Sequence, residues 1–106
     1  MALTSPVEMG GSAESAAACL RALSNPSRLM ILCLLVEGEK TVGEIEKTLE
    51  MSQAYVSQQL ARLRAEKIVA AERDGRLVRY RISDARIAPV IAVLYEQYCG
   101  GTTATA

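Results

Sequence analysis

The residues of this 106-residue chain best suited to chemistry are three cysteines far apart in the sequence, Cys19, Cys33 and Cys99. A thiolate is a nucleophile and a metal ligand, and a pair of thiols can be bridged by oxidation or by added sulfur. An odd number of cysteines does not make a complete framework of structural disulfides. We therefore interpret any pair that reacts as regulatory, able to report on redox or sulfur chemistry.

The local sequence distinguishes the three thiols. Cys99 stands beside Gly100 at the end of the last predicted helix, so we expect it to be accessible and to be attacked first. Cys33 lies within the apolar run 29–36, where a cysteine that only packs as a small apolar side chain stays an open alternative. Cys19 lies in an alanine-rich helix and is interpreted as a packing residue.

The same inventory argues against an enzyme and against a metal site. The chain has no histidine, and none of its nucleophiles has a partner base at a recognisable spacing. The cysteines lack any CxxC-type spacing, although three thiols together could in principle bind a soft metal. We therefore predict no catalytic residues, no metal site and no other cofactor.

Composition and charge suggest one domain with a local basic surface. Half of the residues are apolar but none is Phe or Trp, so the core must be aliphatic, and we expect a dimer to complete it. The net charge is zero. Residues 1–50 carry four basic and seven acidic side chains, giving −3, whereas residues 62–86 carry eight basic and four acidic ones, giving +4. Such an asymmetry can place a basic face on a neutral protein.

Nothing in the sequence indicates a membrane protein or a secreted one. No apolar run approaches the roughly 18 residues that a membrane span needs, and the N-terminus lacks the pattern of a signal peptide. We expect a cytoplasmic protein with no membrane partner, in a compartment that keeps thiols reduced.

Hydrophobic periodicity and capping residues predict mostly helices. We expect a flexible arm over 1–11, one domain over 12–99 and a flexible tail over 100–106. Within the domain, helices are predicted over 12–23, 26–36, 41–49 and 52–67, then a hairpin around Asp74-Gly75, and a last helix capped by Asp84. This order, α-α-α-α-β-β-α, predicts a mainly α fold with a β-hairpin wing, the winged helix-turn-helix.

Polar side chains on the fourth predicted helix and arginines on the hairpin form a candidate DNA-binding set. Turning Val56, Leu60 and Leu63 inward leaves short and amide side chains facing outward, as a helix in the major groove requires. Arginines on the hairpin would contact the DNA backbone or enter the minor groove. The candidates are Gln53, Ala54, Tyr55, Ser57, Gln58, Gln59, Arg62, Arg73, Arg76 and Arg79.

These features resemble the ArsR/SmtB family of bacterial repressors over about residues 13–99. Members commonly carry histidine where this chain has Gln59, so a DNA contact there would differ. The resemblance rests on Leu23-Ser24-Asn25-Pro26-Ser27-Arg28-Leu29, Val42-Gly43-Glu44-Ile45, Ser52-Gln53, Val56-Ser57-Gln58-Gln59-Leu60, Leu63-Arg64, and Asp74-Gly75 through to Tyr80.

The resemblance implies a homodimer joined through the first and last helices, with two recognition helices on operator DNA. Many members sense metals, but the histidines and thiolates of their metal sites are missing here. The positions of Cys33 and Cys99 resemble instead the sulfide-responsive branch. That branch implies that Cys33 and Cys99 form a dithiol, that persulfides convert it into a polysulfide link, and that DNA affinity then falls.

Three alternatives stay open at this point. The repressor could answer general oxidants through a plain Cys33–Cys99 disulfide, which requires Cα atoms within about 7 Å. It could still sense a metal through its cysteines. A winged-helix module that binds other proteins and no operator is the alternative from another functional class.

Overall fold

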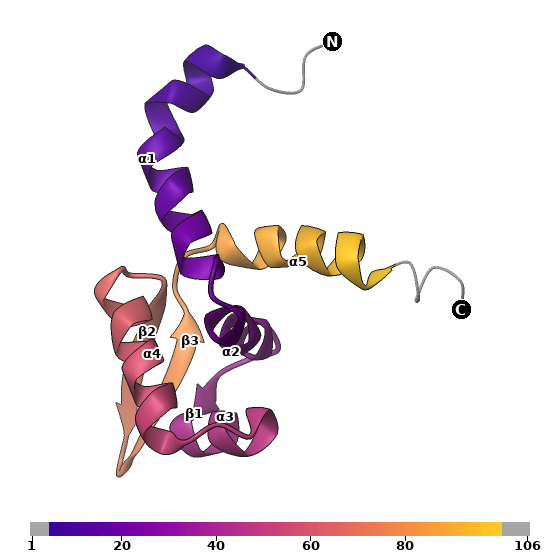
Figure 1. Cartoon of the computed structure of the whole chain (residues 1–106). Coiled ribbons are helices and arrows are strands. Elements are labelled where there is room, and N and C mark those ends of the chain that lie inside the picture. The colour runs from indigo at the N-terminus through magenta and orange to yellow at the C-terminus, as the bar shows by residue number, and fades with distance from the viewer. Residues whose placement is uncertain (1–4, 101–106) are drawn as a thin grey trace.

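The computed structural model describes residues 5–100, and it has the predicted architecture of helices with a β-hairpin wing (Figure 1). The strands form one antiparallel sheet in the order β1-β3-β2. The mainly α, winged helix-turn-helix prediction is confirmed. The elements are α1 (Pro6–Leu23), α2 (Pro26–Val36), β1 (Lys40–Thr41), α3 (Val42–Leu49), α4 (Gln53–Ala65), β2 (Val69–Asp74), β3 (Leu77–Ile82) and α5 (Ile87–Tyr98).

Side-chain caps fix where the middle helices begin. The Asn25 side chain accepts a hydrogen bond from the Arg28 amide at the start of α2, and Pro26 follows at the first helical position. Thr41 and Glu44 form a reciprocal capping box at α3. Ser52 accepts from the Tyr55 amide at α4. These three starts agree with the sequence prediction.

The first helix is longer than predicted. It begins at Pro6, so the flexible arm expected over 1–11 is wrong for residues 6–11, while residues 1–4 lie outside the described range. The Ser5 hydroxyl accepts a hydrogen bond from the Glu8 amide at 3.3 Å, and Pro6 occupies the first turn. The helix continues through Gly10 and Gly11 although their low helix propensity costs about 1 kcal/mol each. The tail expected over 100–106 lies, from residue 101 onward, outside the described range.

The sheet is wider than predicted because β1 adds a short third strand, with Thr41 opposite Arg79. The hairpin turn also lies one residue later than expected. Asp74 pairs with Leu77, so Gly75 and Arg76 form the two-residue loop. Gly75 has a φ of 66°, which suits a glycine at the first central position of a type II′ turn.

Asp84 acts differently from the helix cap that was predicted. Its carboxylate accepts hydrogen bonds from the backbone amide and the guanidinium of Arg86, at 3.0 and 2.9 Å. The helix α5 begins only afterwards, at Ile87, whose amide donates to the Asp84 carbonyl. Asp84 therefore stabilises the turn that leads into α5.

The core is aliphatic and lies between α2, α3, α4 and the sheet, with Ile31, Leu32, Ile45, Leu60 and Leu63 fully buried. In contrast, α1 and α5 project from this body in two directions (Figure 1). Within residues 5–100, no single helix is both long and apolar enough to cross a membrane; α1 and α2 meet that test only as a pair, bent by 98°.

Candidate functional site

The outer face of α4 carries five of the ten predicted DNA-binding side chains. Val56, Leu60 and Leu63 face the core and are fully buried. Tyr55 is half-buried beside them. The opposite face is exposed, small and polar, as close approach to base edges requires. Its members are Gln53, Ala54, Ser57, Gln58, Ala61 and Arg62.

Gln59, which was predicted as a DNA contact, does not belong to that exposed face. The side chain is only 8% exposed. Its Oε1 accepts a hydrogen bond of 3.4 Å from Nη1 of Arg28 on α2. The spacing from Val56 to Gln59 and from Gln59 to Leu63 is the spacing of the buried stripe. The period alone therefore favours an inward Gln59, and the amide side chain obscured that signal.

Arg28 is a structural residue that the sequence analysis did not single out. Its Nε donates to the Ala22 carbonyl and its Nη2 to the Arg21 carbonyl, both at 3.0 Å. These carbonyls belong to the last turn of α1, where helical partners are missing. Together with the bond to Gln59, one guanidinium therefore joins the end of α1, the start of α2 and the inner side of α4.

The three wing arginines do not share one surface. Arg76 lies in the turn and Arg73 near it, and both are exposed. Arg73 pairs with Val78, whereas Arg79 pairs with Glu72. Residues directly opposite in a sheet share a face and neighbours in a strand alternate, so Arg73 and Arg79 lie on opposite faces.

Arg79 is also the least available of the three. It is half-buried, and its Nε lies 3.9 Å from Oδ2 of Asp74. Its charge also contributes to holding the pKa of the Glu44 carboxyl below its ordinary value, after the larger effect of the hydrogen bond from the Thr41 amide. Arg73 and Arg76 are thus the stronger candidates for phosphate contacts.

The structure brings Cys33 and Cys99 to one cavity between α2 and α5, which the sequence alone did not establish. The cavity has a volume of about 380 Å³. Cys33 is half-buried and Cys99 exposed, and all three cysteines carry thiols. The remaining lining is almost entirely apolar: Leu29, Met30, Ile91, Leu94, Tyr95 and Tyr98.

The two thiols differ in how readily they ionise. Burial raises the pKa of the Cys33 thiol, and the neighbouring Cys99 adds a smaller increase of the same sign. Cys33 is therefore a weaker nucleophile at neutral pH than an ordinary cysteine. Cys99 is exposed, as predicted from its place beside Gly100, and its attack by reagents before Cys33 stays a prediction.

Cys19 lies apart from this pair, in a cavity between α1 and the turn that precedes α5, where Asp84 and Arg86 also line it. Burial and then the Asp84 charge raise the pKa of its thiol, while Arg86 opposes them. The packing role predicted for Cys19 fits its contacts with the core. Between residues 5 and 100, no three His, Cys, Asp or Glu side chains gather as a metal site.

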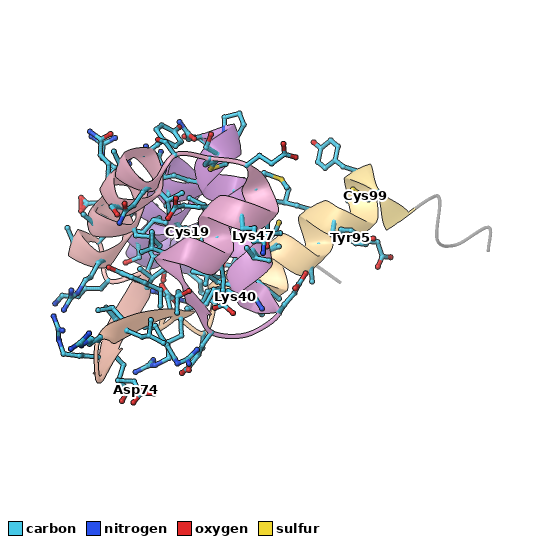
Figure 2. The ribbon with its side chains drawn as sticks, turned by 90° about the horizontal axis from the view of Figure 1, so that it is seen from below. Cys19, Lys40, Lys47, Asp74, Tyr95 and Cys99 are labelled. Carbon is cyan, nitrogen blue, oxygen red and sulfur yellow. The ribbon has the colours of Figure 1, made fainter. Side chains whose placement is uncertain are left out.

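The thiol pair and the wing lie at opposite ends of the molecule. Figure 2 shows Asp74 at the tip of the hairpin and Cys99 near the end of α5. An effect of the thiols on the wing or on α4 would therefore have to pass through the helices between them.

Comparison with known proteins agrees with this architecture. Residues 25–71 match the family described as "Bacterial regulatory protein, arsR family". The chain is 40% identical to the biofilm growth-associated repressor of Xylella fastidiosa, over 87% of this chain and 81% of that one. It is 37% identical to the transcriptional activator HlyU of Vibrio cholerae, over 87% and 85%. These relatives are transcriptional regulators and not enzymes.

Solved structures give the same result. The crystal structure of the repressor BigR from Xylella fastidiosa has a TM-score of 0.87 at 38% identity, covering 91% of this chain and 98% of that one. The homodimeric winged helix-turn-helix DNA-binding domain of Mb0332 from Mycobacterium bovis has a TM-score of 0.71 at 32% identity, covering 89% and 86%.

Proposed function

This chain belongs to the arsR family of bacterial regulatory proteins, and on that premise we propose that it is a homodimeric repressor that senses reactive sulfur species through Cys33 and Cys99. The reduced protein would bind operator DNA, and a sulfur link between the two thiols would release it. The observation that carries the proposal is the shared apolar cavity of Cys33 and Cys99.

The exposed face of α4 and the wing tip support binding to double-stranded DNA. A short, mostly polar helix face with a neighbouring pair of exposed arginines suits a major-groove helix and backbone contacts beside it. One of the two relatives is named a repressor and the other an activator. We propose a repressor because the relative with the higher identity and the BigR structure are both repressors.

Unpaired apolar side chains on α1 and α5 support a homodimer. Val7, Met9 and Leu20 are exposed along α1, as is Val93 on α5. Two projecting helices with such side chains would bury them against the same helices of a second copy. The Mb0332 domain, a homodimer, also supports a dimeric state for this chain.

The chemistry can be written with a persulfide, RSSH, as the only reagent. The Cys99 thiolate attacks the outer sulfur, giving Cys99–SSH and RS⁻. This persulfide attacks the R-bearing sulfur of a second RSSH, releasing HS⁻ and forming Cys99–S–S–SR. The Cys33 thiolate then displaces RS⁻ from the middle sulfur. The net reaction, Cys99–SH + Cys33–SH + 2 RSSH → Cys99–S–S–S–Cys33 + 2 RSH + H₂S, uses the second persulfide as oxidant.

A link between Cys33 and Cys99 would couple α5 to the DNA-facing helix. Cys33 lies on α2, and α2 holds α4 through the hydrogen bond from Arg28 to Gln59. Because α5 would also lie in the dimer interface, joining it to α2 would change the spacing of the two recognition helices.

The test treats the reduced protein separately with glutathione persulfide and with hydrogen peroxide. The intact mass and the affinity for DNA upstream of the protein's own gene are followed together. We expect a Cys33–Cys99 link with added sulfur only after persulfide, accompanied by DNA release. Cys33→Ser and Cys99→Ser should each abolish release, whereas Cys19→Ser should keep it.

Two results would contradict the proposal. An equal response to peroxide through a plain disulfide would make the protein a general oxidant-responsive repressor. A complete link that leaves DNA affinity unchanged would remove the sensing role altogether.

A further inference from the structure

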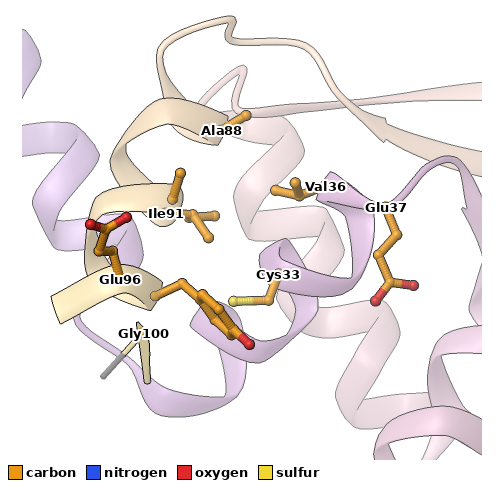
Figure 3. Close-up of a pocket in the computed structure, with 9 residues that line it drawn as sticks. Cys33, Val36, Glu37, Ala88, Ile91, Glu96 and Gly100 are labelled. Atoms are coloured by element: carbon orange, nitrogen blue, oxygen red, sulfur yellow. The ribbon is translucent and has the colours of Figure 1, made fainter. Parts of the chain in front are cut away.

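Cys33 can be approached from a second side. A cavity of about 590 Å³ lies between the end of α2 and α5, and Cys33, Ile91 and Tyr95 line both this cavity and the apolar one. Figure 3 shows the Cys33 sulfur pointing into this second cavity. The side chain of Cys33 therefore lies in the wall that the two cavities share.

The charge on the second approach is entirely negative. Glu37, at the end of α2, and Glu96, on α5, stand on opposite sides of the cavity (Figure 3). Among its described lining residues there is no lysine or arginine, and the same holds for the apolar cavity. An anionic reagent approaching Cys33 thus meets two carboxylates on one side and apolar side chains on the other, and neither compensates its charge.

The apolar cavity has the size and lining of a site for a small organic molecule. Its volume of about 380 Å³ lies within the range of roughly 300–1,000 Å³ that such sites occupy. Cys33 and Cys99 both line this cavity. A molecule bound there that carries sulfur in the zero oxidation state would therefore lie near both nucleophiles.

We propose, on the basis of the function proposed above, that this site takes uncharged organic polysulfides as a direct inducer, and that the exposed carboxylates of Glu37 and Glu96 slow the reaction of anionic carriers with Cys33. An organic trisulfide, RSSSR, supplies the whole link in two displacements. One thiolate attacks the central sulfur and releases RS⁻, and the other displaces the second RS⁻ from that same sulfur. The net reaction is 2 Cys–SH + RSSSR → Cys33–S–S–S–Cys99 + 2 RSH, which needs no further oxidant.

The selectivity follows from where each thiol stands. Cys99 is exposed and does not line the cavity that holds the carboxylates, and of the two only Glu96, three residues earlier, is its neighbour, so Cys99 should discriminate less between charged and uncharged carriers than Cys33 does. Cys33 should react mainly with uncharged ones. An anionic carrier would therefore react with Cys99 faster than the link to Cys33 is completed.

The test uses two trisulfides of matched size, bis(2-carboxyethyl) trisulfide and its amide, bis(2-carbamoylethyl) trisulfide. Reaction rates are measured in Cys19→Ser/Cys99→Ser, which keeps only Cys33, and in Cys19→Ser/Cys33→Ser, which keeps only Cys99. At low ionic strength we expect Cys33 to prefer the amide about tenfold more strongly than Cys99 does, and the preference to shrink in high salt.

Two further variants separate charge from shape. Glu37→Gln/Glu96→Gln should remove most of the preference at Cys33 by accelerating the anionic carrier alone. The matched control Glu50→Gln/Glu72→Gln changes two exposed carboxylates that line neither cavity and should leave the preference intact. Site-resolved peptide masses from the wild-type protein give the same ratio without any cysteine substitution.

An equal preference at Cys33 and Cys99, or one that survives Glu37→Gln/Glu96→Gln, overturns this inference. Such a result would leave the proposed sensor intact if glutathione persulfide still links the thiols and releases DNA. Conversely, a selective link that leaves DNA bound would contradict the sensor and not the selectivity.

Discussion

The Nη1 of Arg28 donates a hydrogen bond of 3.4 Å to Oε1 of Gln59, joining the helix that carries Cys33 to the inner side of α4. The other two guanidinium bonds of Arg28 go to the carbonyls of Arg21 and Ala22, at the end of α1. Gln59, in the middle of α4, is therefore held by an arginine of α2 that also binds the end of α1.

Replacing Gln59 with leucine should weaken both folding and DNA binding. The substitution removes the acceptor of a partly buried guanidinium N–H, and leaving such a donor unpaired costs about 1–3 kcal/mol. Urea denaturation measures the loss of stability. Operator binding, at a temperature where the variant is folded, measures the loss of DNA affinity. Gln58→Leu, one residue along on the exposed face, should leave stability nearly unchanged. If both variants are equally stable, the bond to Arg28 contributes nothing.

Arg76→Ala should weaken DNA binding on every sequence to a similar extent. Arg76 lies in the exposed wing turn, where a phosphate contact is expected and base reading is not. Losing one phosphate contact should reduce the slope of log affinity against log salt concentration by about 1. Titrations at several salt concentrations check this. An unchanged slope would place the wing tip away from DNA.

Gln58→Ala should change the preference among operator variants. Gln58 is on the exposed face of α4, where an amide can read an adenine edge. The expected loss is about 1–3 kcal/mol on the preferred base and little on others. Binding to a set of single-base operator variants measures it. Equal losses on all of them would argue for a phosphate contact.

The alkylation of Cys33 should have a higher midpoint pH in the folded protein than in the unfolded chain. Burial is the main cause of its raised pKa, and Cys99 is the second cause. The experiment uses the Cys19→Ser variant and measures the rate of its alkylation by iodoacetamide as a function of pH. The mass of the peptide that contains Cys33 reports the midpoint at that residue. Adding Cys99→Ser should lower that midpoint part of the way. A midpoint equal to that in urea would mean that Cys33 is not shielded from water.

The free energy of unfolding should depend on pH in the acidic range because of Glu44. The hydrogen bond from the Thr41 amide, 2.8 Å long, is the main reason that the pKa of the Glu44 carboxyl is lowered in the fold. Because the folded pKa is below the unfolded one, this stabilisation is present above the unfolded pKa and is lost as pH falls through the folded pKa. Urea denaturation over acidic pH measures it. Glu44→Gln should flatten the dependence.

Much of the fold could be predicted because its signals are local. The side chains of Asn25, Thr41 and Ser52 cap their helices by accepting from amides three positions away. The hairpin turn depends on the positive φ of Gly75 alone. The beginning of α1 was missed although Ser5 and Pro6 are also a local signal, because two glycines nearby indicated a loop. Strand β1 was missed because its two residues are extended only through pairing with β3.

The winged helix-turn-helix, the exposed face of α4 and the reactive residue types follow from local sequence, since periodicity and capping act within a few residues. Which of these side chains meet depends on the packing of the whole domain. That packing placed Gln59 against Arg28, 31 positions away, and so removed it from the exposed face of α4. It also brought Cys33 and Cys99 to one cavity and set Glu37 and Glu96 beside Cys33. Contacts between distant segments depend on how helices pack, and no local pattern encodes that packing.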